Sequence, residues 1–268
     1  MAAEGIVQID EMRRAETRCH ASIRECARST DLPRCTQAKL STPFALQTMP
    51  RRSTSLWVLP AAAAIIGAML GGPWLWLHYA GKPLATVLIF WLAASAQPAV
   101  TARYRRAVLA GMALSLVGDV CLMLPGDHFV AGLIAFLLAH VCYIAAFAPG
   151  SSGRARAGGL MLIATVALVN LVGLLPRIDA ELKVPVFAYV AVLASMAGFA
   201  LARAWTPALT DAMPRSARFA AAGAVCFVAS DSLLAWDRFA GNIPMPALLV
   251  LGTYYIAQWC IAKSVLRR

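Results

Sequence analysis

Two aspartates interrupt apolar stretches of the chain and could form a paired acid/base site. Asp119 lies in LSLVGDVCLML, and Asp231 lies in CFVASDSLLAW. A carboxylate in the middle of a membrane helix costs about 2.5–3.5 kcal/mol on insertion scales, so such residues are rare and usually functional. One protonated acid beside one carboxylate is an arrangement that enzymes use for acid/base hydrolysis. We therefore interpret Asp119 and Asp231 as the candidate catalytic residues.

The surroundings of the two aspartates are similar, which indicates an internal repeat. Residues 106–147 align with residues 218–259 without a gap and with ten identities. The identical pairs include Arg106 with Arg218, Gly111 with Gly223, Leu122 with Leu234, and Tyr143-Ile144-Ala145 with Tyr255-Ile256-Ala257. Parallel duplications of helices are known in membrane proteins. The pattern therefore predicts two parallel four-helix repeats, with both aspartates at the same depth.

The elements that must position these residues are long apolar segments. Of the 268 residues, 60% are apolar and 14% are charged, an apolar excess beyond that of soluble domains. A bilayer is crossed by about 20 apolar residues. We predict an all-α polytopic membrane domain over residues 53–268, a bundle of eight transmembrane helices. The expected spans are 57–78, 83–100, 106–124, 129–148, 158–175, 184–205, 217–236 and 245–265.

The net charge of +11 reflects membrane topology and not a nucleic-acid partner. Lysine and arginine occur in short clusters between apolar segments, as in cytoplasmic loops, and do not form one basic face. Because every second loop is basic, we expect both termini in the cytoplasm and the protein in the inner (cytoplasmic) membrane of a bacterium. Residues 1–52 carry nine basic and six acidic side chains. We interpret them as a disordered or dispensable tail, with Met49 as a candidate native start.

Eight further polar side chains are expected near the level of the aspartates and are the candidate substrate-binding residues. Lys82 is expected to begin the second helix. Each of these side chains also has a structural interpretation, because tyrosines pack between helices, a lysine can reach the interface and an asparagine can link helices. No cofactor motif occurs, the apolar segments hold too few ligands for a metal, and the seven scattered cysteines form no site. The candidates are Lys82, His140, Tyr143, Asn170, Tyr189, Tyr254, Tyr255 and Gln258.

An ordered set of short motifs resembles the YhhN family of membrane proteins, over about residues 57–266. The set is Lys82-Pro83-Leu84, Gly118-Asp119, Gly132 with Phe136, His140 and Tyr143, then Tyr189 and Met196, Ser230-Asp231, and Tyr254-Tyr255-Ile256-Ala257-Gln258. The resemblance implies an eight-helix membrane hydrolase. Characterised members cleave the vinyl-ether bond of lysoplasmalogens to a fatty aldehyde and glycerophosphoethanolamine or glycerophosphocholine.

The implied reaction suits a pair of carboxyl groups. A vinyl ether hydrolyses when its β-carbon is protonated and water captures the resulting oxocarbenium ion. A neutral acid would deliver the proton, while a carboxylate would steady the cation and activate water, as in glycosidases. We expect Asp119 and Asp231 to share these roles in either order, with Lys82 and His140 holding the phosphate of a lysolipid that arrives from the bilayer.

Two other functions remain open on the sequence. Paired membrane carboxylates and repeated halves also occur in proton-coupled carriers, so a transporter or exporter of a small amphiphile is the alternative. A purely structural membrane protein would leave the aspartates unexplained. The polar residues gather toward the outer side, which favours a closed catalytic pocket over a path across the membrane.

Overall fold

The computed structural model describes residues 55–241 and 243–267, and the regular elements in these ranges are helices. The prediction of an all-α fold is therefore confirmed. The predicted tail, with Met49, lies outside the described residues. The α-helices are α2 (Val58–Leu70), α3 (Leu75–Ala94), α4 (Ala102–Met123), α5 (Phe129–Phe147), α6 (Gly153–Leu174), α7 (Ala180–Ala204), α8 (Pro207–Ala212), α9 (Pro214–Ala240) and α10 (Pro246–Ser264), with the 3₁₀ helices η3 (Gly72–Trp74) and η4 (Leu175–Arg177).

Six of the described helices are long and apolar enough to cross a membrane. These are α3, extended to Gly72–Ala94, α4, α5, α6, extended to Gly153–Arg177, α7 and α9. The apolar helix α2 is shorter than a span, and α10 is not among the six. The chain is therefore an integral membrane protein by the character of these helices, while the number of eight spans stays a prediction.

The predicted boundary between the first two helices is wrong. We expected a break near residues 79–82 with Lys82 at the start of a helix, but α3 runs through this point with Pro83 inside it. The chain turns earlier, at Gly71 and Gly72, whose φ angles of 63° and 49° favour glycine. Pro73 follows in η3, where its missing N–H costs nothing. Lys82 is therefore held in mid-helix, where its side chain is buried.

The helix ends follow local sequence rules. Thr101 caps α4 by accepting a hydrogen bond from the N–H of Tyr104 at 3.0 Å, and Ser152 caps α6 in the same way. Helix α9 ends at Gly241, which adopts a φ of 70° and returns the chain toward α10. These ends fix the lengths of the helices that carry the polar residues.

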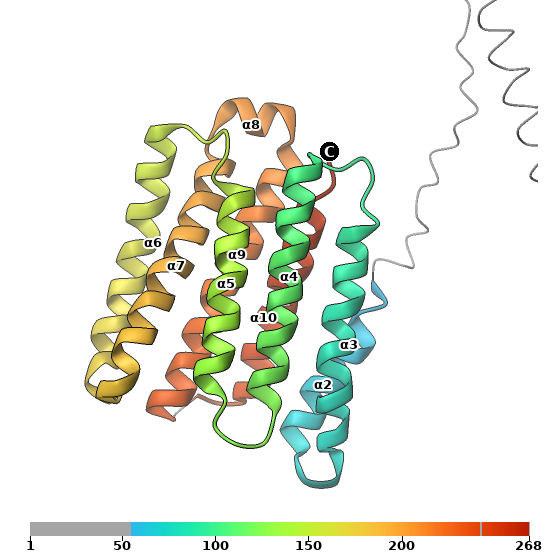
Figure 1. Ribbon diagram of the computed structural model, residues 1–268, viewed down its shortest axis with the longest axis vertical. Helices are drawn as coiled ribbons and strands as arrows, with labels where there is room; N and C mark the ends of the chain where they lie inside the picture. The colour runs from blue at the N-terminus through green and yellow to red at the C-terminus, as the bar shows by residue number, and fades with distance from the viewer. Residues whose placement is uncertain (1–54, 242, 268) are drawn as a thin grey trace, which may run out of the picture. The chain divides into compact units, whose positions relative to one another are not determined.

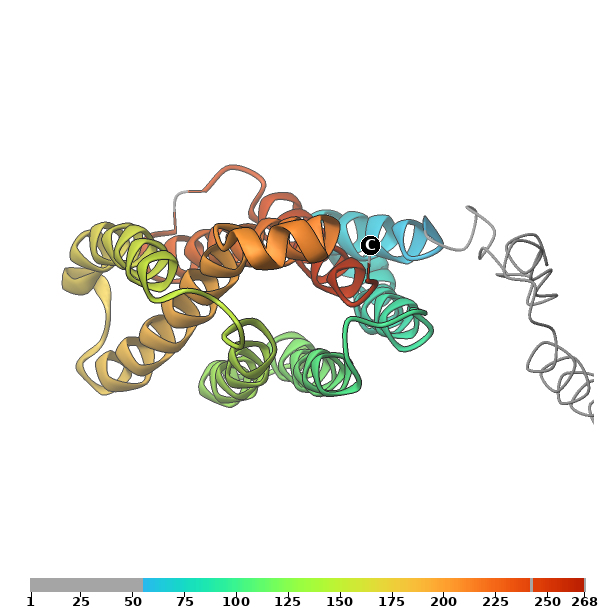
Figure 2. The same ribbon diagram turned by 90° about the horizontal axis from the view of Figure 1, so that it is seen from above.

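Six helices pack in a closed ring, and the remaining two long helices lie outside it (Figures 1 and 2). The ring runs α3, α4, α5, α7, α9, α10 and back to α3. Helix α2 packs on α3 and α10, while α6 packs on α7 and α9. Both aspartates lie on ring helices, Asp119 on α4 and Asp231 on α9. The ring interior is filled largely by aromatic side chains, among them Phe136, Tyr143 and Phe227.

Candidate active site

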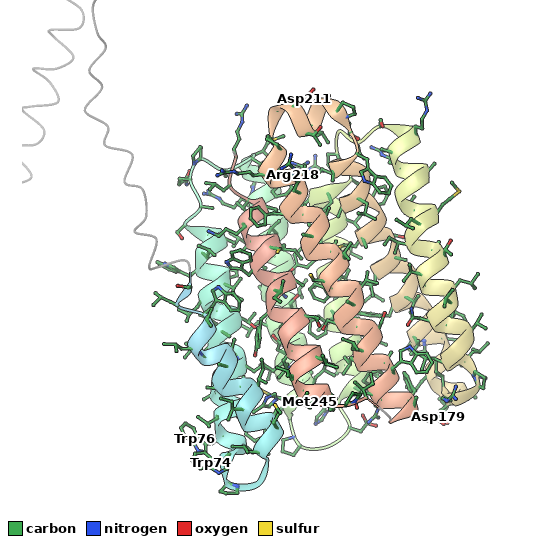
Figure 3. The ribbon with its side chains drawn as sticks, turned by 180° about the vertical axis from the view of Figure 1, so that it is seen from behind. Trp74, Trp76, Asp179, Asp211, Arg218 and Met245 are labelled. Carbon is green, nitrogen blue, oxygen red and sulfur yellow. The ribbon has the colours of Figure 1, made fainter. Side chains whose placement is uncertain are left out.

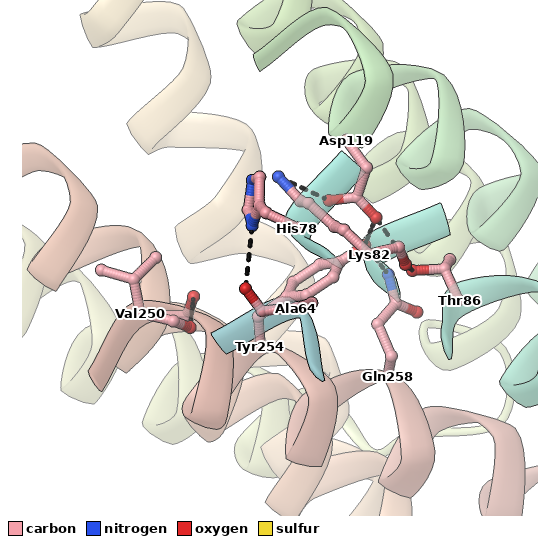
Figure 4. A network of polar contacts seen from close by, with 9 residues as sticks. Ala64, His78, Lys82, Thr86, Asp119, Val250, Tyr254 and Gln258 are labelled. Carbon is pink, nitrogen blue, oxygen red and sulfur yellow. Dashed lines mark hydrogen bonds and ion pairs between the residues drawn. The ribbon is translucent and has the colours of Figure 1, made fainter. Parts of the chain in front are cut away.

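Asp119 is a buried carboxylate with three close partners on two other helices (Figure 4). Its side chain is 1% exposed. Its Oδ2 accepts hydrogen bonds from Thr86 Oγ1 at 2.9 Å and from the Tyr254 hydroxyl at 2.6 Å. Its Oδ1 lies 3.3 Å from Nζ of Lys82. Both carboxylate oxygens are thus engaged, and the negative charge faces a buried cation.

Asp231 has a different environment from Asp119. Its Oδ2 accepts a hydrogen bond from the hydroxyl of Tyr189 on α7. Within the described part of the chain, no lysine or arginine forms an ion pair with it. The neighbouring Ser230 donates from its hydroxyl to the carbonyl oxygen of Val250 at 3.0 Å, which ties α9 to α10 beside the carboxyl. Asp119 therefore has a cationic partner, whereas Asp231 has none among the described residues.

Both aspartates line one polar cavity of about 270 Å³. Its wall includes Lys82 and Tyr254, and it extends to Pro246 and Ala247 at the start of α10. The carboxyl groups thus face a common space that is large enough for several water molecules or a lipid head group.

A second, apolar cavity of about 90 Å³ adjoins the polar one at Asp231, which lines both. Helices α5, α6, α7 and α9 form its walls, with side chains such as Leu133, Val166 and Leu193. Val166 on α6 is 39% exposed. This lining is suited to an apolar group, because burying apolar surface is favourable.

Six of the ten predicted site residues line these cavities, and four do not. The cavity-lining six are Asp119, Asp231, Lys82, Asn170, Tyr189 and Tyr254. Asn170 accepts a hydrogen bond from Trp236 Nε1 at 3.0 Å, so it also links α6 to α9. The predicted roles of all ten residues stay predictions.

The other four predicted residues are buried behind the cavities. The Tyr143 hydroxyl donates to Gln258 Oε1 at 3.2 Å, and Gln258 Nε2 donates to the Tyr254 hydroxyl at 3.1 Å. This chain orients the tyrosine that holds Asp119. His140 is fully buried with its ring 4.7 Å from that of Phe227, and Tyr255 is 1% exposed. Among the described residues, neither His140 nitrogen nor the Tyr255 hydroxyl makes a hydrogen bond of normal geometry.

Sequence reasoning missed His78, Thr86 and Asp237. His78 and Asp237 line the polar cavity, and Thr86 donates to Asp119. Asp237 belongs to the last turn of α9, beyond the predicted span 217–236. His78, Lys82 and Thr86 are four residues apart on α3, a spacing that places them on one helix face. That spacing was a usable signal, hidden by the misplaced helix boundary.

One ion pair joins the ends of the helices that carry the aspartates. Arg238 Nη2 lies 2.8 Å from Oδ2 of Asp127, which belongs to the exposed loop between α4 and α5. The backbone N–H of Phe129 and then the Arg238 guanidinium hold the pKa of Asp127 below its usual value. Both side chains are well exposed, so this pair adds little stability.

Comparison with known proteins places these residues in a described family. The profile of the YhhN family matches residues 77–265, more than half of the chain. Lysoplasmalogenase TMEM86B of Homo sapiens is 34% identical over 164 residues, which cover 61% of this chain and 65% of the human protein. Lysoplasmalogenase TMEM86B of Sus scrofa is 33% identical, with 68% and 72% covered.

A bacterial relative gives the same result. Lysoplasmalogenase of Mycobacterium tuberculosis is 38% identical over 182 residues, with 65% of each chain covered. The chain thus spans about two thirds of the length of these curated relatives, and slightly less for the human and mycobacterial proteins. No solved structure matches the chain.

Proposed function

The chain belongs to the YhhN family, and on this basis we propose that it is a membrane-embedded hydrolase that cleaves the vinyl-ether bond of a lysoplasmalogen-type lysolipid. The observation that carries the proposal is the cavity that Asp119 and Asp231 share, with an apolar cavity adjoining it at Asp231. Relatives named lysoplasmalogenase support the substrate class. The products would be a fatty aldehyde and glycerophosphoethanolamine or glycerophosphocholine.

The different surroundings of the aspartates suggest how the two roles are divided. Asp119 faces Lys82, so it is the carboxylate that steadies the oxocarbenium ion. Among the described residues, Asp231 has only the Tyr189 hydroxyl as a hydrogen-bond partner and lies where the apolar cavity begins, so it is the acid that gives its proton to the β-carbon. The alkenyl chain then occupies the apolar cavity, and the glycerophospho group occupies the polar one.

Lys82 has a second proposed role. Its Nζ pairs with Asp119 but also borders the polar cavity, where it would attract the phosphate of the substrate as a point charge. We expect Lys82→Ala to raise KM more than it lowers kcat. An unchanged KM would remove Lys82 from head-group binding.

The direct test is hydrolysis by purified protein in D₂O. Lysoplasmalogen should yield an aldehyde that carries one deuterium on the carbon next to the carbonyl, because the acid adds its proton there. Asp119→Asn and Asp231→Asn should each lower kcat by at least about a hundredfold. Asp211→Asn, in α8 and remote from both cavities, is the matched control and should retain activity.

Two further assays distinguish the proposed hydrolase from a carrier and from a structural protein. The saturated alkyl-ether lysolipid has no vinyl double bond whose β-carbon could be protonated, so it should not be cleaved. Proton-linked uptake of an amphiphile into liposomes, without aldehyde release, would instead support a carrier. Absence of both activities would leave only the structural interpretation of the protein.

A further inference from the structure

The two proposed roles do not assign a base to the attacking water. Both oxygens of Asp119 are engaged, Oδ1 with Lys82 and Oδ2 with Thr86 and Tyr254. Asp231 is a carboxylate after it has protonated the β-carbon, and it lines both cavities. A second acceptor on the polar side would hold the first proton of the attacking water for the leaving oxygen, while Asp231 recovers its own proton from the hemiacetal.

His78 is the candidate, and its tautomer follows from its partner. Its Nδ1 lies 3.1 Å from the carbonyl oxygen of Ala64 on α2 (Figure 4). A carbonyl oxygen can only accept, so Nδ1 carries the hydrogen. In the neutral ring, the lone pair is then on Nε2. This is the orientation that a histidine base needs.

The position of His78 brings this lone pair to the reacting groups. The residue lines the polar cavity together with Lys82, Asp119 and Asp231. Figure 4 shows its ring beside the Lys82 ammonium and the Asp119 carboxylate. The contact between α2 and α3 that holds the ring is close, because a Cβ on Gly67 would lie 2.6 Å from the backbone nitrogen of His78. The imidazole is therefore held by the Ala64 carbonyl on a residue whose own backbone packs closely against α2.

We propose that His78 is a further catalytic residue, the base that takes a proton from the attacking water and returns it to the leaving oxygen. This inference rests on the proposed vinyl-ether hydrolysis. Water attacks the oxocarbenium carbon, forms the C–O bond of a hemiacetal and loses one proton to Nε2 of His78. No oxidant, metal or other reactant enters this step.

The collapse of the hemiacetal restores both groups. Its hydroxyl proton passes to the Asp231 carboxylate while the electron pair forms the aldehyde C=O bond. The bond to the glycerol oxygen breaks, and His78 gives its proton to that oxygen. The sum is vinyl ether plus water giving aldehyde plus alcohol, with Asp231 protonated and His78 neutral as at the start.

The test compares two substitutions of His78. His78→Gln retains a donor for the Ala64 carbonyl but cannot exchange a proton, and we expect kcat to fall about 10²–10⁴-fold with KM within threefold of wild type. The kcat of His78→Ala should fall by a similar factor, and millimolar imidazole should raise the kcat of this variant at least tenfold. Imidazole should not rescue Asp231→Asn, which is the matched control because that variant lacks the acid.

Three results would overturn the proposal. One is a His78→Gln protein within threefold of wild-type kcat. Another is a folded His78→Ala protein with a normal unfolding temperature that imidazole does not rescue, since a positioning role predicts this. If His78→Ala does not fold, the His78→Gln rate alone decides. Wild-type protein inactive on the vinyl ether would refute the function itself, whereas active wild type with active His78→Gln refutes only the role of His78.

Discussion

Each aspartate accepts a hydrogen bond from a tyrosine of a different helix. The hydroxyl of Tyr254 on α10 donates to Asp119, and that of Tyr189 on α7 donates to Asp231. Each carboxyl group is thus held between its own helix and the helix that carries its tyrosine. The charge of one is balanced by Lys82, while the other depends on its tyrosine alone among the contacts of the described residues.

Removing either tyrosine hydroxyl should reduce activity without unfolding the protein. A hydrogen bond to a charged group contributes about 1.5–3 kcal/mol, so Tyr254→Phe should lower kcat/KM roughly ten- to a hundredfold. The acid Asp231 is neutral before it gives up its proton, and a bond between neutral groups contributes about 0.5–1.5 kcal/mol, so Tyr189→Phe should lower kcat/KM roughly two- to tenfold. Tyr143→Phe removes a hydrogen bond to Gln258 and touches neither carboxyl, so its effect should be smaller. Equal losses in all three variants would contradict direct support of the aspartates.

The buried Lys82–Asp119 pair should affect stability as well as activity. Lys82→Met would leave a 1% exposed carboxylate without its cation, at a cost of about 3–5 kcal/mol. The apparent unfolding temperature in detergent should therefore fall. Lys82→Met/Asp119→Leu should recover most of that loss while remaining inactive. A double variant as unstable as Lys82→Met would show that packing, and not charge, sets the loss.

Sequence reasoning singled out the polar residues but could not give their direction around the helix axis. Asp119, Asp231 and Lys82 stand out because a charge in an apolar segment is costly wherever it points. His140 and Tyr143 occur at a similar level, yet they face Phe227 inside the ring and not the cavities. Residues turn by 100° per position on a helix, so rotation errors that hydropathy cannot detect decide which side chains reach a cavity.

At the scale of the elements, the α2–α3 hairpin is the largest departure from expectation. Hydropathy favoured a long first helix and treated Pro83 as a helix start. Packing overrides this, because a Cβ on Gly81 would lie 2.6 Å from the carbonyl oxygen of Pro60, so the two helices meet closely one residue before Lys82. The remaining long helices were located to within a few residues, since their apolar runs end at charged or glycine-rich loops.

Close contact between α4 and α5 should depend on a glycine next to the site. A Cβ on Gly118 would lie 2.6 Å from the Phe136 ring, so Gly118→Ala must displace Phe136 or move the helices apart, at about 1–3 kcal/mol. We expect a lower unfolding temperature and lower activity. Gly252→Ala on α10 is the control, because nothing lies within 4 Å of its Cβ and the added methyl favours the helix. Equal stability of the two variants would argue against the close contact.

At the scale of the whole membrane domain, corresponding helices occupy corresponding places in the ring. α4 and α9 begin at Ala102 and Pro214, which are 112 residues apart, the offset of the predicted repeat. α3 packs on α4 and α10, while α7 packs on α9 and α5. These relations suit two parallel repeats, and the repeat itself stays a prediction. The identities in the sequence indicate the offset of the repeat. Only the folded structure shows that helices of one half pack against helices of the other half.

The orientation of this domain is open to a direct test. Asp211 and Arg218 lie at one end of the helices and Asp179 at the other (Figure 3). By the positive-inside rule, we predict that the end with Arg218 faces the cytoplasm. In a cysteine-free background, Asp179→Cys should react with a membrane-impermeant thiol reagent in intact cells. Asp211→Cys should react only after permeabilisation, and the reverse pattern would invert the proposed topology.

The shared wall at Asp231 has a consequence for how the two products depart. The scissile bond would sit where the apolar and the polar cavity adjoin, so its cleavage separates a hydrocarbon from a water-soluble phosphodiester. The aldehyde would diffuse laterally past α6 into the bilayer. The phosphodiester would diffuse out past the start of α10. The two products would therefore be released independently. Accumulation of the aldehyde in the bilayer would not slow release of the phosphodiester into water, and accumulation of the phosphodiester would not slow release of the aldehyde.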